Sequence, residues 1–415
     1  MTKLERMIAE LCPDGVEYKT LGEVGEFYGG LSGKSKDDFT DGNARYITYM
    51  NVFSNLAVKT DIKDFVKVAP NERQNSVNVG DILFTGSSET REESGMSSVL
   101  TVEVDEPLYL NSFCFGLRLN CSNILLPGFS KYLFRSDELR KQIIMTASGV
   151  TRFNVSKEKM KHVRIPLPPL PIQQEIVRIL DNFIELTAEL TAELTKRNKQ
   201  YEYYRNELLN FNAPPFWTNV RHVMLSEVCL RTNNIRWKET DEDYYYIDLT
   251  SVSRETNEIK PELMINAENA PSRAQQIIKT NDVLFATTRP TLKRYCYVPL
   301  EYNGHICSTG YCVLRANEQM IIPKFMFYSI STGNFYKYVE DNQEGTSYPA
   351  ISDTKVKKYS FCLPSLAEQA RIVSILDRFD LLTNDITSGL PAEIAARQKQ
   401  YEYYRDKLLN FEEII

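Results

Sequence analysis

The sequence predicts a mixed α/β (α+β) fold in which two pseudo-symmetric globular domains are separated by a pair of long antiparallel helices. Three observations support this fold class. The 415-residue chain contains a long internal repeat, the repeated segments have the apolar spacing of helices, and the regions between them alternate short β-branched and aromatic runs with turn residues. The order along the chain is therefore globular region, helix, globular region, helix.

The internal repeat is strongest at the end of each half. Residues 200–211, Gln-Tyr-Glu-Tyr-Tyr-Arg-Asn-Glu-Leu-Leu-Asn-Phe, return at 400–411 with two changes. Upstream, residues 167–183 match residues 363–379, so the offset changes from 196 to 200 and indicates a four-residue insertion. The intervening regions show only faint echoes, such as Asp-Ile-Leu-Phe at 81–84 and Asp-Val-Leu-Phe from position 282. The two helical segments are thus nearly identical, whereas the globular regions match only at scattered positions.

Both repeated segments predict long helices. After the proline-rich run at 166–171, apolar residues from Ile176 to Leu208 recur at spacings of three, four and seven. Helices of about 40 residues would extend about 60 Å, and we expect the two to pair along this stripe. Gly389 and Pro391 are expected to kink or interrupt the second helix.

The repeat also predicts domain boundaries and local elements. We expect a first domain at 1–165, a central helical spacer at 166–212, a second domain at 213–362 and a C-terminal helical spacer at 363–415. Within the domains, β-branched and aromatic runs predict strands, and a 3.6-residue pattern predicts a helical stretch. The predicted strands are 46–52, 81–85, 244–249 and 282–286, and the helical stretch is 129–144.

Composition narrows the class of protein. With 42% hydrophobic and 25% charged residues, the chain can bury real cores, which excludes disorder. Eight scattered cysteines without metal-ligand spacing, no signal peptide and no run of about 18 apolar residues predict a reduced, cytoplasmic protein without a membrane span. The net charge of −6 does not favour nucleic-acid binding, although local basic loops still permit it because charge interactions are screened over about 8–10 Å.

Motifs for catalysis are incomplete in this sequence. The run Gly-Gly-Leu-Ser-Gly-Lys-Ser at 29–35 has three residues, rather than four, before Gly-Lys-Ser, so it predicts a basic turn and not a nucleotide-binding loop. The segment Asn-Ala-Pro-Pro-Phe at 212–216 departs from the motif of amino-methyltransferases by an inserted alanine, and it predicts a linker. The three histidines are dispersed, and no nucleophile elbow occurs. We therefore expect a chain that is not an enzyme by itself.

Basic and polar loops remain as candidates for binding. Loops 85–94 and 286–294 follow equivalent strands but differ in content, and a second equivalent pair surrounds 149–153 and 345–349. Arginine and lysine can bind phosphates or guanine edges. The candidate DNA-binding residues are Lys34, Lys36, Arg91 and Arg152 in the first half, and Arg289, Lys293, Arg294 and Tyr348 in the second.

The repeated segments resemble a known family. Leu-Pro-x-Leu…Gln…Ile-Val-x-Ile-Leu-Asp-x-Phe at 167–183 and 363–379, the Gln-Tyr-Glu-Tyr-Tyr-Arg tails and the tandem Thr-Ala-Glu-Leu at 187–194 resemble the conserved regions of type I restriction-modification specificity subunits. The resemblance covers essentially the whole chain. It implies that the two globular domains are target recognition domains, each recognising one half of a bipartite double-stranded DNA sequence.

The resemblance also implies partners and cofactors. Two modification (methyltransferase) subunits would dock on the helices, and restriction (motor) subunits would complete the complex. S-adenosylmethionine, ATP and magnesium would then belong to these partners, with no cofactor in this chain. The candidate partner-binding residues are Tyr201, Tyr204, Arg205, Tyr401, Tyr404 and Arg405, and the alternative for the tyrosines is packing between the helices.

Two other functions remain open from the residues. The chain could be an adaptor that docks protein partners without binding DNA, or, with less support, a self-contained DNA methyltransferase. A separate expectation concerns the helix insertion, which aligns two tetrads at 188–195 with three at 384–395. One more Thr-Ala-Glu-Leu unit would add about 6 Å to the helix and is expected to lengthen the spacer between half-sites by about one or two base pairs.

Overall fold

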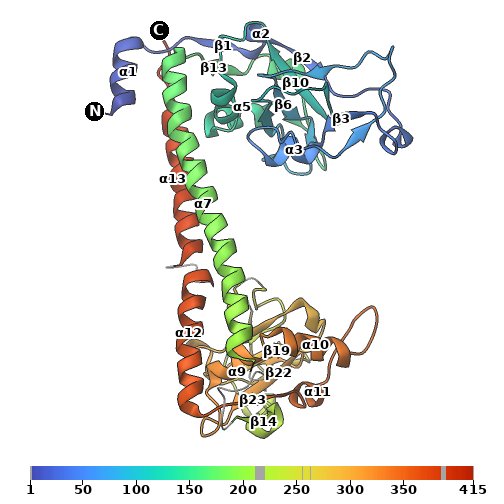
Figure 1. Ribbon diagram of the computed structural model, residues 1–415, viewed down its shortest axis with the longest axis vertical. Helices are drawn as coiled ribbons and strands as arrows, with labels where there is room; N and C mark the ends of the chain where they lie inside the picture. Colours follow the sequence, from blue (N-terminus) through green and yellow to red (C-terminus); the bar gives the residue numbers. More distant parts are fainter. Residues whose placement is uncertain (1, 211–219, 255, 262, 385–388, 415) are drawn as a thin grey trace. The chain divides into compact units, whose positions relative to one another are not determined.

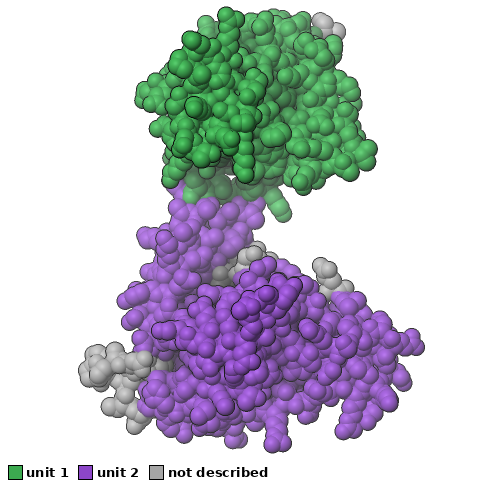
Figure 2. Space-filling model, turned by 90° about the vertical axis from the view of Figure 1, so that its right-hand side faces the viewer, with its two compact units in different colours: residues 1–188, 396–415 green, residues 189–395 purple. Residues whose placement is uncertain are grey.

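The computed structural model describes residues 2–210, 220–254, 256–261, 263–384 and 389–414. These residues divide into two compact units (Figure 2): a first unit of residues 1–188 and 396–415, and a second unit of residues 189–395. The division crosses the long helices α7 (Leu170–Leu208) and α13 (Leu390–Leu408). Each unit therefore combines one globular region with a part of these helices.

The first unit begins with a capped helix and continues as short strands and helices (Figure 1). Thr2 caps the first helix through the backbone N–H of Glu5, whose carboxylate accepts the Thr2 N–H in return. The elements are α1 (Lys3–Leu11), β1 (Tyr18–Thr20), α2 (Leu21–Val24), β2 (Gly25–Gly29), η1 (Lys36–Phe39), β3 (Ala44–Ile47), α3 (Tyr49–Ser54), β4 (Phe65–Val66), β5 (Ser76–Val77), β6 (Ile82–Thr85), β7 (Ser87–Ser88), β8 (Ser97–Val99), β9 (Leu108–Leu110), β10 (Cys114–Leu119), α4 (Pro127–Leu133), α5 (Asp137–Met145), β11 (Ala147–Ser148), β12 (Phe153–Val155), α6 (Lys157–Met160) and β13 (Arg164–Pro166).

The second unit follows a similar but not identical order of elements, with different sequences. Its elements are β14 (Arg221–Met224), α8 (Leu225–Val228), β15 (Cys229–Leu230), η2 (Trp237–Glu239), β16 (Tyr244–Ile247), β17 (Met264–Ile265), β18 (Ala274–Ile277), β19 (Val283–Ala286), η3 (Pro290–Leu292), β20 (Tyr295–Tyr297), η4 (Leu300–Tyr302), β21 (Ile306–Ser308), β22 (Tyr311–Ala316), α9 (Pro323–Ser329), α10 (Gly333–Asn342), α11 (Asp353–Lys357), β23 (Ser360–Leu363) and α12 (Leu366–Asn384).

The sheets confirm the predicted pseudo-symmetry. In the first unit, sheets β2-β10-β6-β8 and β4-β3-β9-β5 are accompanied by the pair β1-β13, and in the second unit the corresponding orders are β15-β22-β19-β20, β17-β16-β21-β18 and β14-β23. In each unit two named strands pair in parallel at the same place, β3 with β9 and β16 with β21. The two halves therefore share a mixed α/β topology although their sequences have diverged.

An ion pair with a buried carboxylate is repeated in both units. Arg118 binds Asp81 through two hydrogen bonds of 3.0 and 2.6 Å, and Arg315 binds Asp282 through two of 2.8 and 2.7 Å. Both carboxylates are almost fully buried. These pairs tie the strand that follows each aspartate, β6 or β19, to its neighbour β10 or β22 and explain why the Asp-x-Leu-Phe run recurs in the sequence.

A buried glutamine joins each long helix to its globular region. Gln173, near the start of α7, accepts the backbone N–H of Leu126 at 2.8 Å and donates to the carbonyls of Ile124 and Pro168 at 2.9 and 2.8 Å. Gln369 of α12 makes the equivalent bonds to Ile322, Met320 and Pro364, at 2.8, 3.2 and 2.9 Å. The repeated Leu-Pro-x-Leu…Gln motif therefore encodes a joint between helix and domain.

The helices pair within each unit in the predicted antiparallel sense. In the first unit, Ile176 and Leu180 near the start of α7 share a core with Tyr401 of α13. In the second unit, Tyr201 near the end of α7 stacks on Phe379 of α12, with ring centroids 6.2 Å apart. Helix α7 thus meets the C-terminal helices in reverse chain order.

Three local predictions can be compared with the observed elements. The predicted strand at 46–52 is wrong beyond Ile47, because Thr48 caps the helix α3 by accepting the backbone N–H of Asn51 at 3.2 Å. The predicted helical stretch at 129–144 is confirmed as α4 and α5. The predicted interruption at Gly389 and Pro391 falls where α12 ends at Asn384 and α13 begins at Leu390; residues 385–388 lie outside the described residues.

Candidate nucleic-acid interface

The two variable loops predicted separately in each half meet in the structure. In the first unit, β7 of loop 85–94 pairs with β12, which follows loop 149–153, and the backbone N–H of Val155 donates to the Gly86 carbonyl at 2.9 Å. In the second unit, Thr288 bridges to Ala350, and the Arg289 N–H donates to the Pro349 carbonyl at 2.7 Å. Each unit therefore presents one combined loop surface.

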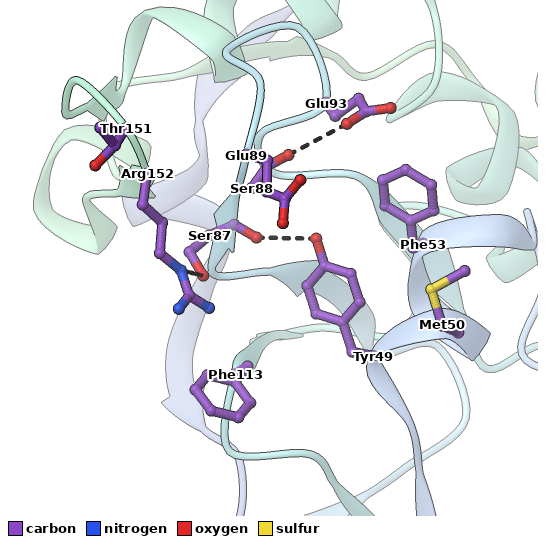
Figure 3. Close-up of a pocket in the computed structure, with 10 residues that line it drawn as sticks. All are labelled: Tyr49, Met50, Phe53, Ser87, Ser88, Glu89, Glu93, Phe113, Thr151 and Arg152. Carbon is purple, nitrogen blue, oxygen red and sulfur yellow. Dashed lines mark hydrogen bonds between the residues drawn. The ribbon is translucent and has the colours of Figure 1, made fainter.

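The combined loops of the first unit form one side of a cleft (Figure 3). The cleft has a volume of about 500 Å³. Helix α3 supplies further wall residues, and the turn between β9 and β10 supplies Phe113. The lining residues, called here the first-unit cleft, are Tyr49, Met50, Phe53, Ser87, Ser88, Glu89, Glu93, Phe113, Thr151 and Arg152.

Arg152 is held at the edge of this cleft by two contacts. Its Nε donates to the Ser87 hydroxyl at 3.1 Å, and its guanidinium lies 5.6 Å from the centroid of the Phe113 ring. Arg152 is exposed, so its guanidinium faces solvent with a fixed orientation. An oriented guanidinium is the group that recognises a guanine edge or a phosphate through two hydrogen bonds.

Apolar side chains are exposed around the same cleft. Met50 and Phe113 are each 58% exposed, and Val150 in the neighbouring loop is 91% exposed. On the opposite wall, Tyr49 stacks on Phe53 and donates its hydroxyl to the Ser87 carbonyl at 2.9 Å. Exposed apolar groups beside arginine suit contact with thymine methyl groups and unstacked base steps.

The second unit presents a corresponding pair of arginine and aromatic ring from the opposite loops. The Arg289 guanidinium lies 4.5 Å from the centroid of the Tyr348 ring, and Tyr348 is 71% exposed. Arg289 and Lys293 flank η3 and both have left-handed backbone conformations, with φ of 48° and 55°. Such conformations are uncommon for residues other than glycine and indicate a loop whose shape is fixed by its surroundings.

Three predicted DNA-binding residues are placed less favourably. The Lys34 side chain is 7% exposed and pairs with Glu72 at 2.5 Å, which argues against Lys34 as a DNA contact. The same pairing is the leading reason that the pKa of Glu72 falls to about 2. Lys36 is exposed at the start of η1 and does not line the cleft, and Arg294 donates its guanidinium to the Leu249 carbonyl.

Two predicted DNA-binding residues remain, Arg91 and Lys293. Arg91 is exposed in loop 85–94 but does not line the cleft. Lys293 is exposed, and its Nζ lies 5.1 Å from the centroid of the Tyr336 ring. Tyr49 and Phe113, which line the cleft, were not predicted from the sequence. The position of Phe113 in a short turn between two strands is the sequence feature that could have indicated it as a binding residue.

The tyrosines of the long helices have two different roles. Tyr201 and Tyr401 are 7% and 4% exposed and pack in the cores, so they are poor candidates for partner binding. Burial raises the pKa of Tyr401 to about 12. Tyr204 and Tyr404 are about two-fifths exposed, and each stacks one face on a phenylalanine.

The arginines that follow these tyrosines are also engaged. Arg205 lies over the Tyr201 ring at 5.3 Å and Arg405 over the Tyr401 ring at 5.7 Å. Arg405 in addition binds the Asp406 carboxylate through bonds of 2.9 and 2.8 Å. The most exposed aromatic residues of the repeat are instead Tyr203 and Tyr403, each 62% exposed, which the sequence analysis did not single out.

Among the described residues, no group of three or more histidine, cysteine, aspartate or glutamate side chains is close enough to hold a metal ion. Within the same residues, none of the helices has the length and apolarity needed to cross a bilayer. The eight cysteines are free thiols.

Comparison with known proteins identifies the family. Residues 13–199 and 218–396 each match the Type I restriction modification DNA specificity domain. A type I restriction enzyme specificity subunit of Haemophilus influenzae, S.HindORF215P, is 35% identical over 64% of this chain and 68% of its own length. The EcoR124I/EcoR124II specificity subunit of Escherichia coli is 34% identical over 62% of this chain and 65% of its own length.

The fold agrees with this comparison. One solved structure is described as showing the structural basis of complex assembly and conformational transition of the type I R-M system. A chain from it superposes on this chain with a TM-score of 0.64 and 19% sequence identity, covering 96% of this chain and 98% of that chain. Membership of a specificity family also agrees with the expectation that the chain is not an enzyme by itself. The chain belongs to the family of type I restriction-modification DNA specificity proteins.

Proposed function

We propose that this chain is the cytoplasmic DNA-recognition subunit of a type I restriction-modification complex, and that each unit recognises one half of a bipartite double-stranded target. The observation that carries the proposal is the repeated loop surface. In both units the same topology joins two loops of divergent sequence and presents an oriented arginine beside an exposed aromatic ring. Divergent recognition surfaces on a common scaffold are what two different half-sites require.

The near-identical helices support a role in assembly. Tyr203 and Tyr204, and equally Tyr403 and Tyr404, form edge-to-face pairs with ring centroids 5.4 and 5.3 Å apart. Exposed tyrosines are enriched at the energetic centres of protein interfaces. Two equal tyrosine pairs suit two copies of one partner, which we assign as the modification subunits, with the restriction subunits joining them. S-adenosylmethionine, ATP and magnesium belong to those partners.

The relatives favour this function over the two alternatives. They are named as specificity subunits of restriction enzymes, and one solved relative comes from work on the assembly of such a complex. A protein adaptor would not need recognition loops that differ between two otherwise matching domains. A self-contained methyltransferase would need a binding site for its methyl donor.

Methylation mapping tests the proposal directly. Cells that express the chain with its modification subunit are compared with cells that lack only this chain, and adenine methylation is mapped across the genome. A bipartite motif that disappears with the chain is the expected result. An unchanged methylation pattern would contradict the proposal and favour the adaptor.

The assembly role has its own test. Tyr203→Ala and Tyr403→Ala are compared singly and together by counting the modification subunits bound to each chain in native mass spectrometry. We expect each single variant to weaken one of two sites and the double variant to weaken both. Binding of two subunits with unchanged affinity in the double variant would remove the tyrosine pairs from the interface.

A further inference from the structure

Two largely buried arginines of the first unit, Arg135 and Arg140, donate hydrogen bonds to backbone carbonyls of segments that contribute to the cleft. Arg135 follows α4, and Arg140 lies in α5. Burial lowers the pKa of each guanidinium to about 10, which leaves both charged at neutral pH. A buried charge is retained only where its donors are satisfied, so the groups that these arginines contact are held firmly.

Arg140 fixes the loop that forms one wall of the cleft. Its two terminal nitrogens donate to the carbonyls of Gly95, Ser94 and Glu92 at 2.7, 2.6 and 2.9 Å. The same loop carries Glu93, which lines the cleft. Gly95 has a φ of +64°, and a β-carbon there would approach the Ile143 side chain to 2.5 Å, so the loop is packed closely on α5.

Arg135 fixes the opposite wall. It donates to the carbonyls of Phe53, Val52 and Asn55 at 2.8, 3.2 and 3.4 Å, where α3 ends, and its Nε donates to the Ser97 carbonyl at 2.7 Å. The last carbonyls of a helix have no partner within the helix, so a cation there both satisfies and stabilises them. Helix α3 supplies Tyr49, Met50 and Phe53 to the cleft.

The second unit has no equivalent pair. In the repeat, Tyr132 aligns with Tyr328, which places Ser331 and Tyr336 at the positions of Arg135 and Arg140. The corresponding loop is held by other contacts: the Lys293 N–H donates to the Pro290 carbonyl at 3.1 Å, the Arg289 N–H donates to the Pro349 carbonyl of the second loop at 2.7 Å, and the Arg294 guanidinium donates to the Leu249 carbonyl. The arginine pair therefore belongs to the first recognition surface alone.

We propose that Arg135 and Arg140 are positioning residues that set the two walls of the first-unit cleft and thereby the base specificity of the first half-site. The inference rests on the proposed function. Neither guanidinium contacts DNA; each acts through the carbonyls that it binds. Because recognition groups must be held to within about 0.5 Å of their working geometry, release of one wall relaxes base discrimination.

The test uses the full chain with its modification subunit. Arg140→Lys, Arg140→Met and Arg135→Met are introduced separately, and methylation of cognate and singly substituted sites is compared for each half-site. We expect discrimination at the first half-site to fall by about tenfold or more, within the range of a single mismatched base pair, while discrimination at the second stays unchanged. Arg140→Lys is expected to relax it less than Arg140→Met, because lysine retains the charge and some donors.

The controls separate positioning from general stability. Tyr336→Phe, at the position matching Arg140 in the second unit, removes a hydroxyl that has no hydrogen-bond partner among the described residues and should leave both half-sites unchanged. Amide exchange in 92–95 should accelerate in the Arg140 variants. Unchanged specificity, or an equal loss at both half-sites in a folded complex, would overturn the inference. A wild-type chain that directs no bipartite methylation would instead overturn the proposed function.

Discussion

Replacing Asp282 with asparagine is expected to destabilise the second unit more than Asp81→Asn destabilises the first. Both carboxylates are buried, with 2% of Asp81 and 1% of Asp282 exposed, and asparagine keeps their volume. The partners differ, because the Arg315 side chain is 13% exposed whereas that of Arg118 is 42% exposed. Loss of the carboxylate therefore leaves Arg315 as a charge with little access to water, while Arg118 can be hydrated.

The size of the difference follows from these exposures. Removing one partner of a buried ion pair costs about 3–5 kcal/mol, whereas an exposed pair contributes about 0–1 kcal/mol. Asp81 also accepts the Tyr28 hydroxyl at 2.7 Å, but that neutral donor can bond to the asparagine oxygen. We expect Asp282→Asn to lower the free energy of unfolding of the second unit by about 3 kcal/mol or more. Asp81→Asn should lower that of the first unit by about 1–2 kcal/mol, which lies between the values for a buried pair and an exposed pair.

Amide hydrogen exchange measures each unit separately within the intact chain. Amides of β19 and β22 report on the second unit, and amides of β6 and β10 on the first, because the most protected strand amides exchange through opening of their own unit. A loss of 3 kcal/mol corresponds to exchange on the order of a hundredfold faster, since about 1.4 kcal/mol is tenfold. Equal acceleration in the two variants, or less than threefold in Asp282→Asn, would refute the reasoning.

Three further predictions concern DNA contact, acid stability and the length of α7. Arg152→Ala should weaken DNA binding and reduce the dependence of that binding on salt. Lys34→Ala should leave the DNA affinity and its salt dependence unchanged, because Lys34 is paired with Glu72. Fluorescence anisotropy of labelled DNA over a salt series distinguishes the two variants. Glu175 is 5% exposed, and its bonds to Arg178 and Lys3 lower its pKa from 4.5 to about 2. The stabilisation that Glu175 gives the first unit is therefore present above about pH 5 and is lost as the pH falls through 2. Glu175→Gln should reduce this acid dependence of amide exchange in α1, and an unchanged pH profile would contradict the prediction. Adding one Thr-Ala-Glu-Leu unit to α7 should lengthen the spacer between half-sites by about one or two base pairs, and methylation mapping that returns the parental spacing would contradict this.

The helices and most strands could be predicted because their signals are local. The apolar stripe from Ile176 to Leu208 places α7, and the runs that begin at Asp81 and Asp282 place β6 and β19. The helix α3 was missed because its cap, Thr48, stands inside an apolar and β-branched run that also fits a strand. Tertiary structure, rather than the local pattern, decided between them.

The candidate site was predictable only in part, because its decisive contacts join distant residues. The loops at 85–94 and 149–153 could be chosen separately, but their pairing through β7 and β12 is a tertiary contact. Lys34 was chosen as a basic residue in a glycine-rich turn, and its partner Glu72 lies 38 positions away. The tyrosine repeat likewise did not indicate which ring is buried. Tyr201 and Tyr203 are two residues apart, but Tyr201 is 7% exposed and Tyr203 is 62% exposed.

The glutamine joint has a consequence for how such proteins can change. Gln173 and Gln369 bind only backbone N–H and carbonyl groups, of Leu126, Ile124 and Pro168 in one case and of Ile322, Met320 and Pro364 in the other. Because the glutamine binds backbone groups, its hydrogen bonds do not require particular side chains in the domain that it joins. A globular region of foreign sequence that keeps this backbone path can therefore satisfy the same glutamine, so the joint itself does not restrict how the recognition surface of the domain diverges.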